Sequence, residues 1–193
     1  MVKTIDKIKN AAIELLFVRG EFQSNSEKIA DYAKVRRPLI YYYFNSVEDL
    51  IDNIIKETRI QRDQKILDIL ASEAELSEKI GDLFDLHLEQ TIKYPFRQIY
   101  ISTHKKKLKT SKTINDPDEI VIQKLKHLFD KELNKNNLRL NSSNQAILLL
   151  ASYLNYPLLM ISLGPRALEL SKVEYINLLK ERKSIFTSLV FKN

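Results

Sequence analysis

Two arginines followed by three consecutive tyrosines mark the segment 36–44, which reads RRPLIYYYF. Successive residues of an α-helix are about 100° apart, so three adjacent tyrosines cannot all face one core. Ile40 and Phe44 share the face expected to be buried, which leaves three side chains outside: Leu39, Tyr42 and Tyr43. Arginine can pair with a guanine edge or a phosphate, and tyrosine can bond a phosphate, so the pattern favours contact with nucleic acid. In the alternative, the tyrosines pack on neighbouring helices and the arginines are solvated.

The helices that must position this segment can be located from their start and stop signals. Apolar residues at helical spacing predict a helix over 5–19, which Gly20 ends. A second, short helix begins within the run SNSE at 24–27, where any of the first three residues could be the N-cap. Lys34 ends this helix.

A third helix begins at Pro38, since proline suits the first helical position, and it runs to about Phe44. Proline also disfavours a helical backbone at the preceding residue, here Arg37. Two short helices joined by a tight turn predict a helix-turn-helix. Six further helices are predicted beyond it: 45–72, 77–94, 96–103, 116–136, 141–163 and 171–190.

The composition narrows the fold and the chemistry. The chain has 193 residues, no cysteine and three glycines. Without cysteine there is no disulfide scaffold, and the chain suits a reducing, cytoplasmic compartment. So few glycines exclude a glycine-rich phosphate loop and favour an all-α fold over a strand-rich one. The charged, polar start also lacks the apolar core of a secretory leader.

The formal net charge of +6 is unevenly spread. Residues 1–46 carry eight basic and five acidic side chains, and residues 47–96 are acidic. Residues 97–112 carry six basic and no acidic side chains, mostly in the run Lys105–Lys112, which is expected to be a solvated loop rather than a nucleic-acid site. The overall charge is therefore weaker evidence for a nucleic-acid partner than the segment 36–44.

The stretch 140–165 has no charged residue before its final proline and is long enough for a membrane span. Several polar or helix-breaking residues interrupt it: Asn144, Gln145, Asn155 and Pro157. A helix that is apolar nearly all round also suits a deep core or an oligomer interface. We favour the buried interface and expect no membrane association.

No set of residues indicates catalysis or metal binding. The three histidines are not spaced as a ligand pair, and no serine-histidine-acid order or carboxylate pair can be placed together. We therefore expect neither an enzyme nor a bound metal or cofactor. Aromatic, apolar and polar residues on the later helices could line an apolar pocket, although such residues more often form a core. The candidates are Phe84, His87, Leu88, Tyr100, His104, Phe129, Tyr153, Asn155, Tyr156 and Met160.

Residues 8–50 resemble the DNA-binding domain of TetR-family bacterial repressors, in both order and spacing. Three runs carry the resemblance: I-x-x-A-A-x-x-L-x-x-x-x-G at 8–20, I-A-x-x-A-x-V at 29–35 and L-I-Y-Y-Y-F-N-S-x-E-x-L at 39–50. Such proteins are all-helical homodimers that pair through their last two long helices and usually hold a small-molecule pocket. The resemblance implies an N-terminal three-helix helix-turn-helix domain (1–46) and a larger antiparallel helical domain for ligand binding and dimerisation (47–193).

The resemblance also assigns residues. Ser26 falls where the family contacts phosphate, and the turn and recognition helix supply the remaining expected DNA contacts: Lys34, Arg36, Arg37, Pro38, Leu39, Tyr41, Tyr42 and Tyr43. Two positions depart from the family pattern. Lys34 replaces the usual turn glycine, where a left-handed backbone would carry a modest cost. Val47 replaces a lysine that usually anchors phosphate, a loss for which Lys34 and Arg36 could compensate.

The sequence thus predicts a ligand-responsive transcriptional regulator, expected to be a repressor, that binds operator DNA as a homodimer. The two copies are expected to pair through the helices at about 142–163 and 171–190. Its ligand would be small and apolar or aromatic. The alternative is a helical carrier of small apolar molecules without DNA binding. The exposure of Leu39, Tyr42 and Arg37 separates the two, because a carrier would bury them.

Overall fold

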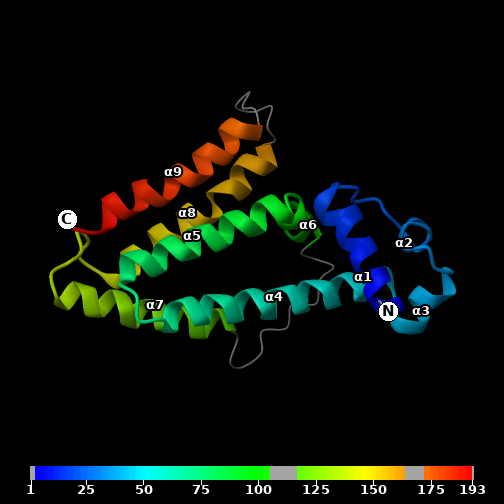
Figure 1. Cartoon of the computed structure of the whole chain (residues 1–193), viewed down its shortest axis with the longest axis horizontal. Helices are drawn as coiled ribbons and strands as arrows, with labels where there is room; N and C mark the ends of the chain where they lie inside the picture. The colour runs from blue at the N-terminus through cyan, green and yellow to red at the C-terminus, as the bar shows by residue number, and fades with distance from the viewer. Residues whose placement is uncertain (1–2, 105–116, 164–171, 193) are drawn as a thin grey trace. The chain divides into compact units, whose positions relative to one another are not determined.

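The computed structural model describes residues 3–104, 117–163 and 172–192; within these ranges the side chains of 102, 117–118, 155–163, 172, 175 and 179 are not described. Figure 1 shows the helices in chain order. Their bounds are α1 Thr4–Ile13, η1 Glu14–Val18, α2 Ser26–Ala33, α3 Pro38–Tyr43, α4 Val47–Ala71, α5 Leu76–Lys93, α6 Arg97–His104, α7 Pro117–Asn134, α8 Ser143–Leu163 and α9 Lys172–Val190. In the described part, the only extended pairing is an isolated antiparallel bridge between Leu138 and Phe191. The expected all-α fold is confirmed.

The chain forms two compact units. The first comprises Met1–Gln61 and Thr91–Ser111, and the second comprises Arg62–Gln90 and Lys112–Asn193. The first unit is larger than the predicted DNA-binding domain of 1–46, because the start of α4 and the helix α6 also contribute to its core. The predicted boundary at residue 46 follows the motif rather than the packing, and it stays a prediction.

The first helix changes its winding before it ends. After α1, residues Glu14–Val18 form a π-helical turn, η1, in which Leu15, Leu16 and Phe17 are all buried. Gly20 follows with φ +71°, a left-handed conformation that glycine adopts without steric cost. A Cβ atom there would lie 3.0 Å from the Phe96 ring, so glycine also permits the close approach of that ring. The predicted helix stop at Gly20 is confirmed.

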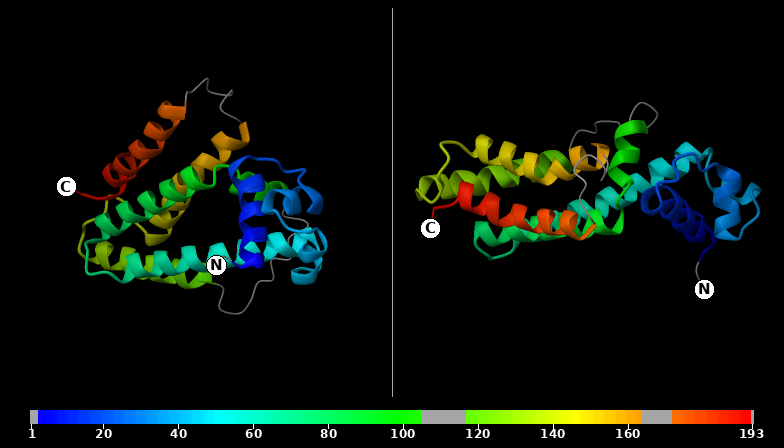
Figure 2. Two further views of the ribbon diagram at one scale, coloured as in Figure 1. Left: turned by 45° about the vertical axis from the view of Figure 1, so that its right-hand side comes forward. Right: turned by 90° about the horizontal axis from the view of Figure 1, so that it is seen from above.

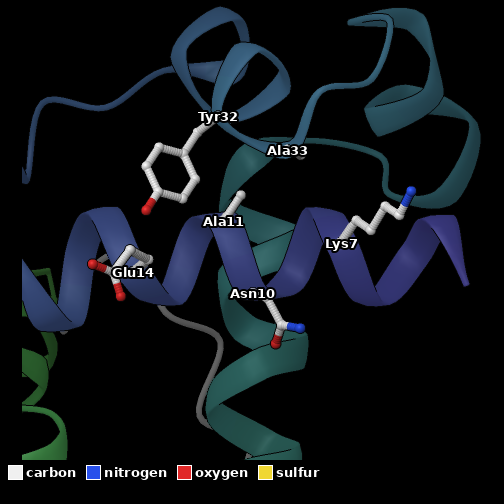
Figure 3. A pocket seen from close by; sticks show the side chains of 6 residues that line it. All are labelled: Lys7, Asn10, Ala11, Glu14, Tyr32 and Ala33. Carbon is white, nitrogen blue, oxygen red and sulfur yellow. The ribbon is translucent and has the colours of Figure 1, made fainter. Parts of the chain in front are cut away.

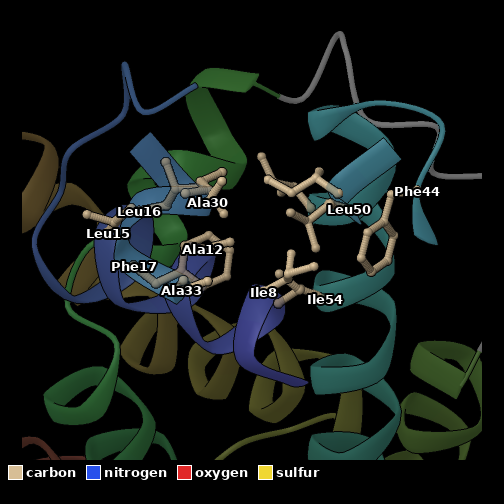
Figure 4. Packing of buried hydrophobic residues seen from close by; sticks show 14 of the residues in the cluster. Ile8, Ala12, Leu15, Leu16, Phe17, Ala30, Ala33, Phe44, Leu50 and Ile54 are labelled. Atoms are coloured by element: carbon tan, nitrogen blue, oxygen red, sulfur yellow. The ribbon is translucent and has the colours of Figure 1, made fainter. Parts of the chain in front are cut away.

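The core of the first unit collects apolar side chains from α1, η1, α2, α3 and the start of α4 (Figure 4). Ile8, Ile29, Ile40 and Leu50 are fully buried in it. Aromatic residues extend this core to α6. The Tyr100 ring lies edge-on to Phe17, with ring centroids 5.7 Å apart, and the Phe96 N–H donates to the Phe17 carbonyl oxygen at 2.9 Å. The short helices of this unit are therefore fixed by one shared core.

The second unit is built from longer helices. Figures 1 and 2 show α8 and α9 side by side and antiparallel. Their core contains Phe129, Leu150 and Phe186, all almost inaccessible to solvent. The end of α9 is held by the α7–α8 connection, where the Arg139 N–H donates to the Val190 carbonyl and the Lys192 N–H donates to that of Asn137, both at 2.8 Å.

The apolar stretch 140–165 contains the whole of α8. Ala146 and Leu150 are buried, whereas Leu148 is 68% exposed and Ala151 and Ser152 are also exposed. No helix in the described residues is long and apolar enough to cross a membrane.

Candidate nucleic-acid interface

The helix α2 begins and ends as local chemistry requires. Of the three cap candidates, Asn25 is the N-cap, because its side-chain oxygen accepts the Lys28 N–H at 3.0 Å. Lys34 ends the helix with φ 54° and ψ 46°, so the left-handed backbone expected there is confirmed. The N–H groups of Lys34 and Val35 close the turn by donating to carbonyls of the last turn of α2. A lysine thus occupies a position that favours glycine.

The expected non-helical backbone at Arg37 is wrong. Arg37 has φ −48° and ψ −40°, within the right-handed helical region, although Pro38 follows it. The Leu39 N–H donates to the Arg36 carbonyl at 2.9 Å, and the Ile40 N–H donates to that of Arg37 at 3.0 Å. These two hydrogen bonds form a tight first turn that outweighs the steric preference of a residue before proline. Pro38 is the first residue of α3, as predicted.

The two faces of α3 differ as the spacing predicts. Ile40 and Phe44 are buried, whereas Tyr42 is 78% exposed and Tyr41 and Tyr43 are exposed to a lesser degree. Leu39 is only half-buried and packs against the core of the first unit, so its predicted outward direction is only partly realised. The spacing of residues within α3 does not predict this burial, because the core that Leu39 packs against also includes residues of other helices.

Ser26, Arg37 and Tyr41 meet through one oxygen atom. The Arg37 Nε–H and the Tyr41 hydroxyl each donate to Ser26 Oγ, at 2.9 Å in both cases. The Tyr41 hydroxyl raises the pKa of the Arg37 guanidinium, and a nearby Glu27 adds to this. The hydrogen bond with Ser26, and then the Arg37 guanidinium, lower the pKa of the Tyr41 phenol. Ser26 itself is buried, with 3% of its surface exposed.

The other predicted contacts are simpler. Lys34, Arg36 and Pro38 are exposed. Val47 is half-buried against the core of the first unit. Its aliphatic side chain carries no charge, so the phosphate contact that lysine would make is missing.

The start of α4 is instead fixed by a reciprocal cap. Ser46 Oγ accepts the Asp49 N–H at 3.0 Å, and the Asp49 carboxylate accepts the Asn45 N–H at 2.9 Å. The departure at Val47 thus removes a cation without loosening the helix start.

The predicted ligand-site residues are divided between the two units. Tyr100 and His104 lie on α6 in the first unit, where their rings stack with centroids 4.1 Å apart. Five others lie in the second unit: Phe84, His87, Leu88, Phe129 and Tyr153. The side chains of three lie outside the described residues: Asn155, Tyr156 and Met160. The run Lys105–Lys112 also lies outside them. The ligand site therefore stays a prediction, with its described candidates drawn from both units.

Several residues that contact the predicted ligand-site residues were not themselves predicted from the sequence. The Phe186 ring links Phe84 and Tyr153, at 5.5 and 5.8 Å between centroids, and Arg182 is buried beside it with Nη1 donating to the Tyr153 carbonyl. Arg182 and Phe186 are four residues apart on α9, and this spacing could have indicated that they share one buried helix face. In the first unit, Phe22 contacts both Tyr100 and His104 edge-on. It lies in a loop, where periodicity gives no signal.

An open groove of about 370 Å³ lies between α1 and α2 (Figure 3). It is lined by Lys7, Asn10, Ala11, Glu14, Tyr32 and Ala33. None of these was predicted as a site residue, and charges of both signs rim the groove. No group of three or more His, Cys, Asp or Glu side chains that could hold a metal occurs within the described ranges.

Comparison with known proteins agrees with this geometry. Residues 8–54 match the family model of bacterial regulatory proteins of the tetR family. A fatty acid metabolism regulator protein of Bacillus subtilis (strain 168) is 31% identical over 81 residues, a match that spans only 42% of this chain and 42% of that relative.

Solved structures share the fold over nearly the whole chain. The transcriptional regulator FadR from Bacillus subtilis, in complex with stearoyl-CoA, is 17% identical with a TM-score of 0.65, covering 95% of this chain and 98% of that one. A putative transcriptional regulator from Saccharomonospora viridis, in complex with choline, is 15% identical with a TM-score of 0.73, covering 98% of both chains. Residues 8–54, which hold the capped and packed helix-turn-helix, are thus similar to the DNA-binding segment of the tetR family of bacterial regulatory proteins.

Proposed function

We propose that this protein is a ligand-responsive transcriptional regulator that binds operator DNA as a homodimer and acts as a repressor in the cytoplasm. The observation that carries the proposal is the exposure of Tyr42 and Arg37 on a recognition helix whose opposite face, at Ile40, is fully buried. Exposed tyrosines beside arginines suit a partner that offers phosphates and base edges. A carrier without DNA binding would bury these side chains, so the alternative is disfavoured. Nothing in the proposal requires catalysis.

Sequence-independent affinity would come from cations near the recognition helix. Lys34 and Arg36 are exposed, and each could neutralise one phosphate in place of the lysine missing at Val47. We expect Lys34→Ala and Arg36→Ala each to reduce the slope of log affinity against log salt by about one. An unchanged slope in both variants would show that these residues do not compensate for Val47.

Dimerisation would use the exposed apolar residues of α8 and α9. Leu148 projects from α8, and Ile185 and Leu189, four residues apart on α9, are each about half exposed. Aliphatic side chains that share a helix face suit a second copy of the same surface. A dimer would place two recognition helices at adjacent major grooves, about 34 Å apart.

The ligand would bind in the second unit, beside the aromatic residues Phe84, Tyr153 and Phe186. Their rings would pack against an apolar or aromatic molecule and shield it from water. Two structures of similar fold hold stearoyl-CoA and choline, which supports a ligand site in proteins of this architecture. Ligand binding would favour a dimer whose recognition helices no longer match adjacent grooves.

The deciding experiment measures oligomeric state and selective DNA binding together. The full chain is used to select sequences from a pool of randomised duplexes, and the selected duplex is titrated against a scrambled duplex of equal length. We expect a dimer at micromolar concentration and an operator preferred by at least about a thousandfold. A monomer without sequence-selective binding would refute the proposal.

A further inference from the structure

The Ser26 hydroxyl is enclosed by two neighbouring side chains. A serine hydroxyl has two acceptor lone pairs and one donor hydrogen. Arg37 Nε–H and the Tyr41 hydroxyl each donate to Ser26 Oγ, so both lone pairs are occupied. A phosphate would have to accept the remaining O–H, but only 3% of the Ser26 surface is exposed. Its main interaction is therefore with its two neighbours, although the family resemblance places it at a phosphate contact.

Arg37 gains a fixed orientation from this arrangement. The guanidinium is planar and carries five N–H donors, so a hydrogen bond at Nε sets the direction in which the other four point. The Arg37 Cζ also lies 5.8 Å from the centre of the Tyr41 ring, which limits movement on that side. The residue is exposed, and Tyr41 is the side chain that interacts most strongly with its guanidinium.

The adjacent Arg36 provides an internal comparison. It is exposed, and its guanidinium makes no hydrogen bond or ion pair among the described residues. Two neighbouring arginines with the same charge therefore differ in one respect, since the guanidinium of Arg37 is tethered and that of Arg36 is not. A tether adds little to a phosphate contact, which tolerates many orientations. It adds much to a bidentate pair with the O6 and N7 atoms of guanine, which needs a defined plane.

We propose that Ser26 and Tyr41 are positioning residues, which hold the Arg37 guanidinium so that it reads a guanine edge in the major groove. Arg36 supplies charge without sequence information. The inference rests on the proposed function, because it assigns roles within the same DNA-binding surface. It changes the roles of Ser26 and Tyr41 from direct DNA contacts to residues that act through Arg37.

The first test removes one hydroxyl at a time. Tyr41→Phe and Ser26→Ala are each titrated with the selected operator and with a scrambled duplex, at several salt concentrations. We expect the ratio of operator affinity to scrambled affinity to fall about fivefold to tenfold, with scrambled affinity and salt slope nearly unchanged. The matched control is Tyr32→Phe, since the Tyr32 hydroxyl also bonds an arginine, Arg19 Nη2 at 3.1 Å, but lies outside the predicted DNA contacts. Circular dichroism of every variant checks that the helices are retained.

The second test compares the two arginines and couples them to Tyr41. Arg37→Lys is expected to lower the selectivity ratio about tenfold or more, because lysine keeps the charge but lacks the planar fork. Arg36→Lys keeps the charge, so it should leave the affinities for operator and for scrambled duplex nearly unchanged. In the Arg37→Lys background, Tyr41→Phe should have no further effect on selectivity, since the group that it positions is gone.

Three outcomes would overturn the inference while leaving DNA binding intact. Tyr41→Phe could weaken both duplexes equally, which would make Tyr41 a direct phosphate contact. Its effect could be fully additive with Arg37→Lys, or Arg37→Lys could leave selectivity unchanged. If the unaltered protein shows no selective binding to any duplex, the proposed function itself fails, and this inference fails with it.

Discussion

The recognition helix α3 and the exposed face of α8 and α9 both present large apolar or aromatic side chains to solvent, but the residues around those side chains differ. On α3, the exposed tyrosines lie beside Arg36 and Arg37, and Tyr41 shares the Ser26 hydroxyl oxygen with Arg37. On α8 and α9, the exposed residues Leu148 and Ile185 are aliphatic. The first surface suits a polyanion with hydrogen-bonding edges, and the second suits a copy of itself. Exposure alone does not identify a partner, whereas the chemistry of the neighbouring side chains indicates one.

The largest expected effects come from the cores that support these two surfaces. Phe17→Ala in the first unit and Phe186→Ala in the second each remove a fully buried ring and should cost about 3–5 kcal/mol of unfolding free energy. Urea unfolding followed by circular dichroism measures both. If the two surfaces depend on separate cores, Phe17→Ala should impair DNA binding more than dimerisation, and Phe186→Ala the reverse. Equal loss of both activities in both variants would break the comparison.

The next effect concerns the aliphatic surface. Leu148→Asp places a charge at the centre of the proposed dimer contact and should raise the dimer dissociation constant at least about a hundredfold, because a buried unpaired charge is costly. Sedimentation velocity over a concentration series measures this change. The control is Ile122→Asp on α7, where an isoleucine is exposed to a similar extent as the α9 residues. A dimer that tolerates Leu148→Asp would exclude this face.

A smaller effect tests the turn that holds α3. Lys34 has a left-handed backbone, so Lys34→Gly should raise the unfolding free energy by up to about 1 kcal/mol, through relief of strain in the folded state. The same variant should weaken DNA binding if the Lys34 charge contacts phosphate. Urea unfolding and titration at two salt concentrations separate the two effects. If Lys34→Gly instead lowers the unfolding free energy, the lysine side chain stabilises the folded state by more than its left-handed backbone costs.

The smallest expected effect is a pH dependence in the first unit. Burial raises the pKa of Tyr100 from 10.0 to about 12, with small additions from Glu48 and Asp52. The folded protein therefore keeps this proton at pH values where the unfolded chain has lost it. The contribution is complete below pH 10 and is lost as the pH rises towards 12. Unfolding free energy measured across this window should fall less steeply in Tyr100→Phe than in the unaltered protein.

Local signals predicted the helices of the first unit well. Asn25, Gly20 and Pro38 each act within a few residues of their own position, so their effects are visible in the sequence. The buried face of α3 was predicted for the same reason, because a four-residue spacing fixes which side chains share a face. The backbone of Arg37 was predicted incorrectly, since the hydrogen bonds of the following turn outweighed the local effect of proline.

The candidate sites were less predictable. Tyr100 and His104 were grouped with Phe84 and Tyr153 because all are aromatic, but α6 packs against η1 and the loop at Phe22. That contact joins residues nearly eighty positions apart, and no periodicity records it. Leu39 is half-buried for a similar reason.

The all-α fold, the helix-turn-helix and the exposure of Tyr42 follow from the sequence, because helix caps, breakers and periodicity act over a few residues. The packing of the helices, by contrast, brings Ser26, Arg37 and Tyr41 to one hydroxyl oxygen and gives two adjacent arginines different freedom. Ser26 and Tyr41 are fifteen residues apart and lie on different helices. Their meeting depends on how α2 and α3 pack on a common core, which is a sum of many distant contacts rather than a property of any short segment.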